Sequence, residues 1–122
     1  MLNLNSTLVF SEEPKKLADF YTKVFQKKPD WSEGKCYGFM VGQGHFTTCP
    51  HDKVHGRNSN PERIMVNFET RDVRGEFDRV KKLGASVVTE PYSPDEDPEG
   101  EIATLSDPDG NYFQLVTPWE NK

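Results

Sequence analysis

The sequence predicts an α+β fold made of two βαβββ repeats within one domain of 122 residues. Two amphipathic helical stretches each follow a short apolar strand, and three extended stretches follow each helix. A polar segment at about residues 51–62 separates the two halves. A chain of this length suits one domain or two small repeats that share a core.

The first repeat covers about residues 1–50. A strand over Leu4–Phe10 leads into a helix, for which Ser11 is the expected N-cap. Pro29 is expected to end this helix, and extended stretches follow at 30–33, 36–41 and 45–49. The helix carries apolar side chains at positions i, i+3, i+4, i+7 and i+8, a stripe that predicts packing on a sheet: Leu17, Phe20, Tyr21, Val24 and Phe25.

The second repeat, at about residues 63–118, follows the same order. A strand over Ile64–Glu69 precedes a helix over Asp72–Leu83, with Asp72 as the N-cap and Gly84 just past the end. Glu69 and Asp72 flank this junction and are interpreted as capping acids. Extended stretches are expected at 86–89, 102–106 and 111–117, the last two joined by a turn at 107–110.

An acidic segment, Glu90–Glu101, interrupts the second repeat. It holds six acids, three prolines and no base, which favours a solvated loop. A mobile lid over a pocket is a second hypothesis for the same segment.

Composition excludes several partners. The formal net charge is −5, with no basic stripe, so nucleic acid is not an expected partner. No apolar run reaches the ~20 residues that span a bilayer, and the first ten residues lack signal-peptide features, so we expect a cytoplasmic protein without a membrane partner. Cys36 and Cys49 lie thirteen residues apart without a CxxC motif and are expected to be half-buried free thiols.

Three sequence stretches, together with the two repeats, resemble a known superfamily. They are LADFYTKVF on the first helix, VNFETRDVRGEFDRVKKLGASVV in the second repeat and LSDPDGNYFQLVTP near the end. They resemble the vicinal oxygen chelate superfamily of glyoxalases, bleomycin resistance proteins and ring-cleaving dioxygenases. The resemblance implies that each repeat curls its strands into a half-closed, barrel-like cup that lines a cavity. It also implies a homodimer.

The enzymes of that superfamily hold a divalent metal ion. The resemblance places its ligands on the first and last strand of each repeat, usually as His and Glu. Counting along this sequence, these positions fall on neutral side chains: Ser6 (or Asn5), Thr47 (or Thr48), Met65 and Gln114. Only Gln114 could coordinate a hard or borderline ion, so we expect the usual metal site to be absent and no cofactor to be bound.

His45, Cys49, His51 and His55 form a local cluster of zinc-type donors. On a strand, His45 and Cys49 would lie about 13 Å apart at ~3.3 Å per residue, too far to share an ion without a bend. We therefore favour one strand histidine and two loop histidines. His45 alone remains a candidate for a ligand contact or an acid/base group.

These observations lead to three functional hypotheses. The first is a metal-independent protein that binds a small organic molecule in the cup. The second is a metal-dependent lyase, isomerase or dioxygenase with an atypical ligand set that recruits Gln114 and His45. The third is an interaction protein whose cup is filled by its own side chains. We rank them in that order, with these cavity candidates: Ser6, Phe39, His45, Thr47, Met65 and Gln114.

Overall fold

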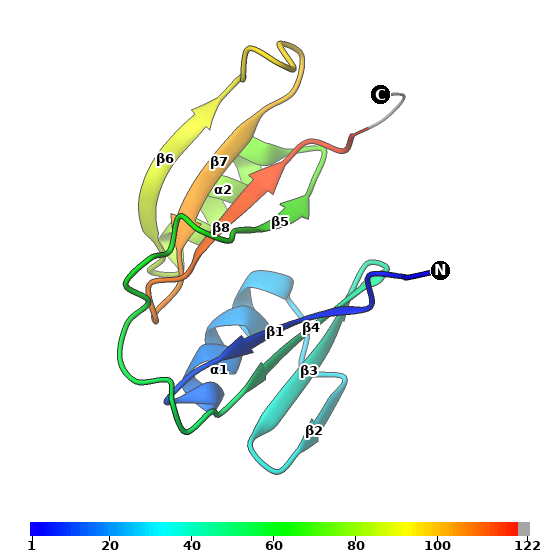
Figure 1. Cartoon of the computed structure of the whole chain (residues 1–122). Helices are drawn as coiled ribbons and strands as arrows, with labels where there is room; N and C mark the ends of the chain where they lie inside the picture. Colours follow the sequence, from blue (N-terminus) through cyan, green and yellow to red (C-terminus); the bar gives the residue numbers. More distant parts are fainter. Residues whose placement is uncertain (120–122) are drawn as a thin grey trace. The chain divides into compact units, whose positions relative to one another are not determined.

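The structure, a computed structural model, describes residues 1–119. The chain forms two compact units, Met1–Gly56 and the part that begins at Arg57, each with one helix and one four-stranded sheet (Figure 1). The elements follow one another as β1 (Ser6–Phe10), α1 (Pro14–Phe25), β2 (Trp31–Glu33), β3 (Cys36–Val41), β4 (Gly44–Cys49), β5 (Val66–Glu69), α2 (Val73–Lys82), β6 (Ser86–Tyr92), β7 (Ile102–Ser106) and β8 (Tyr112–Val116). This order confirms the α+β class and the two βαβββ repeats. Neither sheet of the described residues closes into a barrel.

In the first unit the strand order is β1-β4-β3-β2, with β1 parallel to β4 and the other pairs antiparallel. Helix α1 packs its predicted apolar stripe on one face of this sheet. The ring of Tyr21 lies 4.6 Å from that of Phe46, and the ring of Phe25 lies 5.2 Å from that of Phe39, measured between centroids. These aromatic pairs make the core of the unit.

The start of α1 differs from the prediction. The N-cap is Glu13, which makes no side-chain capping hydrogen bond, and Pro14 occupies the first helical turn. Ser11 was therefore the wrong cap: it is buried two residues earlier, where its hydroxyl accepts a 3.0 Å hydrogen bond from the Glu13 N–H. Proline favours the first position of a helix because its fixed φ suits that turn and its missing N–H is not needed there.

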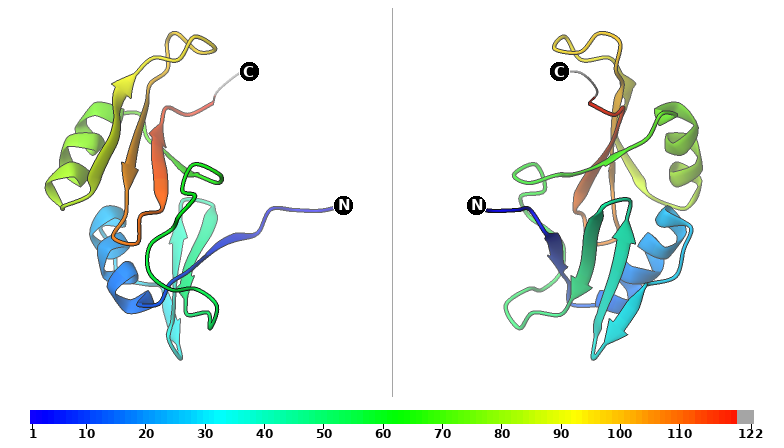
Figure 2. Two further views of the ribbon diagram at one scale, coloured as in Figure 1. Left: turned by 60° about the vertical axis from the view of Figure 1, so that its left-hand side comes forward. Right: turned by 90° about the vertical axis from the view of Figure 1, so that its right-hand side faces the viewer.

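In the second unit the strand order is β5-β8-β7-β6, and α2 lies along one face of the sheet (Figure 2). The helix buries Val73, Phe77 and Val80. Strand β6 continues to Tyr92 through two register irregularities, so the first part of the acidic segment is strand rather than loop, as a correction to the prediction. Pairing with β7 holds this part of the chain extended.

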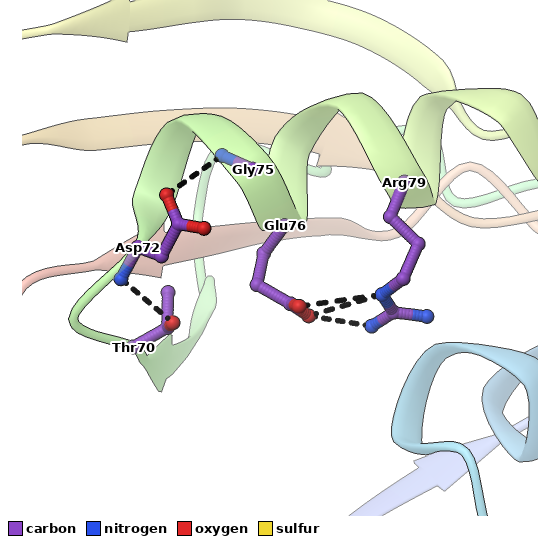
Figure 3. Close-up of polar contacts among 5 residues, drawn as sticks. All are labelled: Thr70, Asp72, Gly75, Glu76 and Arg79. Carbon is purple, nitrogen blue, oxygen red and sulfur yellow. Dashed lines mark hydrogen bonds and ion pairs between the residues drawn. The ribbon is translucent and has the colours of Figure 1, made fainter.

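The predicted cap of α2 is confirmed (Figure 3). Asp72 Oδ1 accepts a 3.0 Å hydrogen bond from the Gly75 N–H, and the Asp72 N–H donates to Thr70 Oγ1 at 3.1 Å. One turn later Glu76 and Arg79 form an ion pair on the same helix, with 2.6 Å between Arg79 Nη2 and Glu76 Oε2. Gly84 follows the C-cap Leu83 with φ of +100°, a conformation that favours glycine.

The two cysteines form a disulfide, so the prediction of free thiols was wrong. They lie half-buried in strands as expected, but the β3–β4 hairpin folds the chain back, and the register Tyr37↔Thr48 continues to bring Cys36 opposite Cys49. Their Cα atoms are 4.3 Å apart. Spacing along the chain did not reveal this pairing because it depends on strand register.

No helix within residues 1–119 is long and apolar enough to cross a membrane.

Candidate functional site

Each sheet has one face on its helix; we call the opposite face the open face. In the first sheet Phe46 and Phe39 point to the helix, so their strand neighbours His45, Thr47 and Met40 belong to the open face. Strand register joins these residues into rows across the sheet. One row holds Ser6, His45 and Met40, and the next runs from Leu8 through Thr47 and Gly38 to Trp31.

The open face of the first sheet is largely apolar. Leu8 is 54% exposed, Met40 50% and Trp31 46%. A Cβ added at Gly38 would overlap the Trp31 ring, so the ring lies directly over this glycine. The glycine thus allows an aromatic ring to lie flat against the strands.

Three of the predicted cavity residues come together on this face. Ser6 lies opposite His45 on β4, and Thr47 is the next residue along β4 on the same face. Phe39 does not join them, because its ring packs against Phe25 on the helix side and is 1% exposed. Its role is in the core.

The open face of the second sheet carries neutral polar side chains. Gln114 on β8 lies beside Asn67 on β5 and beside Thr104 on β7. Gln114 Nε2 donates a 3.0 Å hydrogen bond to Thr104 Oγ1, and Thr104 is buried. Met65, the predicted ligand position, lies before the start of β5. The β5 residue that pairs with Gln114 is Asn67, and counting back from the helix did not identify it.

Sequence reasoning also missed Glu69 as a side chain of this face. It lies two residues beyond Asn67, opposite Val116, and is exposed. The alternation of β5 could have found it, but its place beside the helix start favoured a capping role. The cap is Asp72.

The donor chemistry of the described residues does not fit the superfamily's divalent metal ion. No group of three or more His, Cys, Asp or Glu side chains within residues 1–119 is arranged to hold one. Cys49 is bonded to Cys36, His51 Nδ1 contacts Asp52 and His55 Nδ1 contacts Glu12. Cys49, His51 and His55 are therefore directed to separate partners, and His45 is left without a second zinc-type donor from this cluster.

Two carboxyl groups of the first unit have perturbed acidity. The backbone N–H of Gly56, and next the His55 side chain, donate to Glu12 and lower its pKa. The backbone N–H of Met40, and next the Lys27 ammonium, do the same for the pKa of Asp30. In both cases hydrogen bonds to the charged form cause the shift. Both groups tie loops to their own unit and are exposed.

A pocket lies where the open face of the second sheet meets the acidic segment. Its volume is about 320 Å³, and Ile102 and Val116, which are paired across β7 and β8, line it together with Pro94 and Trp119. The acidic residues Glu96, Asp97 and Glu101 also line it. A second hollow of about 390 Å³ shares Trp119 and extends to Asn67 and Glu69. None of the predicted cavity candidates lines either hollow.

Comparison with known proteins agrees with this architecture. The family model of the glyoxalase-like domain matches residues 7–116, and the chain therefore belongs to the glyoxalase-like domain family. This finding confirms the resemblance to the vicinal oxygen chelate superfamily. Among curated proteins no sequence matches this chain.

Solved structures share the fold at low sequence identity. A glyoxalase-related enzyme from Fulvimarina pelagi has a TM-score of 0.78 and 15% identity, over 97% of this chain and 89% of its own. A glyoxalase/bleomycin resistance protein/dioxygenase family enzyme from Burkholderia phytofirmans PsJN has a TM-score of 0.76 and 18% identity, over 95% and 98%. The fosfomycin resistance protein FosX from Listeria monocytogenes has a TM-score of 0.76 and 17% identity, over 98% and 96%.

Proposed function

We propose that this glyoxalase-like chain is a metal-independent protein that binds a small organic molecule on a strand-lined open face. The observation that carries the proposal is the open face of the second sheet, where a pocket with an apolar floor and acidic residues at its edge lies on the same face as the neutral side chains of Asn67 and Gln114. Apolar walls with sparse polar groups are the usual composition of a small-molecule site.

Metal independence rests on the chemistry of the donors. FosX from Listeria monocytogenes has been solved in complex with Mn(II), but at 19% identity. In this chain the first and last strands of the second unit place two carboxamides side by side, Asn67 and Gln114. In the first unit Leu8 lies beside Thr47. These pairs offer amides, a hydroxyl and an alkyl group, and His45, opposite Ser6, is the one imidazole on β1 and β4, so neither sheet brings together three imidazole or carboxylate ligands.

A metal-dependent lyase, isomerase or dioxygenase is the second candidate. The observation that favours it is Glu69, a carboxylate on the same open face as Gln114. Glu69 and Gln114 together give two donors, fewer than the three protein ligands of a typical catalytic site. This candidate predicts binding of a stoichiometric metal ion that depends on both residues.

The remaining features of the proposal concern partners and location. We propose a homodimer in the cytoplasm, with no nucleic acid or membrane partner, in keeping with the net charge of −5. The cytosol keeps most thiols reduced, so in that compartment Cys36 and Cys49 would be present mainly as a dithiol. Alkylation of freshly lysed cells followed by mass spectrometry of the two cysteines measures that state.

A thermal-shift screen in the presence of EDTA tests the proposed function. A ligand that binds only the folded protein stabilises it by RT ln(1 + [L]/Kd), which is ~2.7 kcal/mol at one hundred times Kd. We expect at least one small organic compound to raise Tm to the same extent with and without EDTA. Stabilisation that appears only after a divalent metal is added would overturn metal independence in favour of the second candidate.

A further inference from the structure

The pocket of about 320 Å³ at the acidic segment has an apolar interior. Ile102 and Val116 form its floor as neighbouring residues of the β7–β8 ladder. Trp119 also lines the pocket and is 70% exposed, so its side chain is accessible to a bound molecule. Such a surface is suited to alkyl groups rather than to a hydrated ion.

The surroundings of the pocket are strongly negative. Glu96, Asp97 and Glu101 line it, and they belong to a twelve-residue segment, 90–101, with six acids and no base. Arg74 Nε donates a 2.6 Å hydrogen bond to Glu101 Oε2, which offsets one of these charges. Even with that guanidinium, the carboxylates outnumber the bases, so an anionic ligand would be repelled.

The hydroxyl group of Thr117 at the pocket already has hydrogen-bond partners. Thr117 Oγ1 accepts a 2.7 Å hydrogen bond from the Glu101 N–H and donates to the Glu101 carbonyl oxygen at 3.1 Å. The ligand must therefore be recognised mainly by charge, by the Trp119 ring and by apolar contact. Hard metal ions require several oxygen ligands at one point, and no three carboxylate, imidazole or thiol side chains within residues 1–119 are arranged to hold one.

We propose that this pocket binds a small organic cation, an ammonium group that carries alkyl substituents. The alkyl groups contact Ile102 and Val116, the positive charge lies against the Trp119 ring, and Glu96 supplies the opposing charge. The proposal rests on the proposed function and deepens it, because it names the place and the ligand class. Its ligand is a free small molecule, in keeping with the pocket volume.

The test compares choline with 3,3-dimethylbutan-1-ol, which has the same shape but carbon in place of the charged nitrogen. The chain has two tryptophans, so Trp31→Phe leaves Trp119 as the only tryptophan reporter. We expect choline to change the Trp119 fluorescence in a saturable manner, with the neutral alcohol roughly tenfold weaker or more, as a cation over an aromatic ring predicts.

Two variants and a matched control locate the effect. Glu96→Gln removes a pocket carboxylate and should weaken choline binding about tenfold, whereas Glu99→Gln removes the same charge from a residue that does not line the pocket and should change it less than about threefold. Trp119→Ala, followed by NMR titration, should also lose about tenfold in affinity. Because Trp119 is exposed, we expect the Trp119→Ala variant to fold as the parent does, and its Tm checks that directly.

Equal affinity for choline and the alcohol, or choline affinity that neither Glu96→Gln nor Trp119→Ala changes, would overturn the inference. Failure of the inference is distinguishable from failure of the proposed function. If compounds from the thermal-shift screen still stabilise Trp119→Ala as they do the parent protein, the binding function stands and the cation pocket is wrong. Saturable choline binding lost in both variants supports the inference.

Discussion

Gln114 Nε2 donates a hydrogen bond of 3.0 Å to Thr104 Oγ1, from the last strand of the second sheet to its neighbour. Gln114 is the only predicted ligand position whose side chain could coordinate a metal ion, and it also takes part in a hydrogen bond within the sheet. Thr104 is 4% exposed, so its hydroxyl depends on a protein partner. The carboxamide is thus held in place by the fold.

The Gln114–Thr104 contact predicts a measurable loss of stability on truncation. Gln114→Ala leaves the buried Thr104 hydroxyl without this partner and should lower the free energy of unfolding by about 1–3 kcal/mol. The matched control is Asn67→Ala, on the adjacent strand but exposed, which should stay within about 0.5 kcal/mol. Urea unfolding measures both. Equal losses of unfolding free energy in the two variants would show that the Gln114–Thr104 hydrogen bond makes no net contribution to stability.

The disulfide between Cys36 and Cys49 should stabilise the first unit. It closes a loop with a sequence separation of 13 residues, for which the chain-entropy account gives about 3 kcal/mol. We expect reduction, or the double change Cys36→Ser and Cys49→Ser, to lower the urea midpoint. The double variant should not respond to a reductant. Identical unfolding of oxidised and reduced parent protein would contradict this prediction.

The two helix starts offer an internal comparison. Asp72 caps α2 through the Gly75 N–H, whereas Glu13 at the start of α1 makes no side-chain cap. Asp72→Ala should therefore cost about 1 kcal/mol of stability, and Glu13→Ala should cost less than about 0.5 kcal/mol. Denaturant unfolding of both variants checks the difference. A larger loss for Glu13→Ala would contradict the assignment of the caps.

Asp30 makes stability depend on pH. Met40 N–H donates to Asp30 Oδ2 at 2.6 Å and Lys27 Nζ lies 2.9 Å from the same atom, and these contacts lower the pKa of the Asp30 carboxyl below its usual value. A folded-state pKa below the unfolded value gives stability that is complete above the unfolded pKa and is lost as pH falls through the folded pKa.

The resulting prediction concerns Asp30→Asn. The Asp30→Asn variant should be less stable than the parent at about pH 7. This difference in unfolding free energy should shrink at about pH 3 and below, because the Asp30 carboxylate of the parent becomes protonated. Asp19→Asn is the control, because the Asp19 ion pair with Lys15 is exposed and contributes little. Guanidinium titrations at both pH values measure the effect. A stability difference between Asp30→Asn and the parent that grows as the pH falls would refute the predicted direction of the pH dependence.

Local patterns were sufficient to predict most of the fold. The stripe from Leu17 to Phe25 and the cap at Asp72 each depend on residues a few positions apart, and the structure confirms both. Ser11 was predicted as the N-cap because serine is a common N-cap residue. The helix instead begins at Pro14, with Glu13 as the N-cap.

Features that depend on register could not be read from spacing. The pairing of Cys36 with Cys49 and of Asn67 with Gln114 requires knowledge of which residues of two strands lie opposite each other. Phe39 was assigned to the cavity because a strand presents both faces, and only contact with Phe25 shows which face it takes. The pocket lined by Trp119 combines the end of β8 with a segment well separated from it in the sequence, so no local sequence motif predicts it.

Metal content per chain distinguishes metal-independent binding from a metal-dependent enzyme. Tag-free protein is purified without chelator, offered Zn, Ni, Mn and Fe(II) in turn, desalted and measured by plasma mass spectrometry. The account predicts background metal under every condition, in the parent and in Gln114→Ala alike. Close to one ion per chain, lost in Gln114→Ala or Glu69→Ala, would contradict metal-independent binding and identify a metal-dependent enzyme instead.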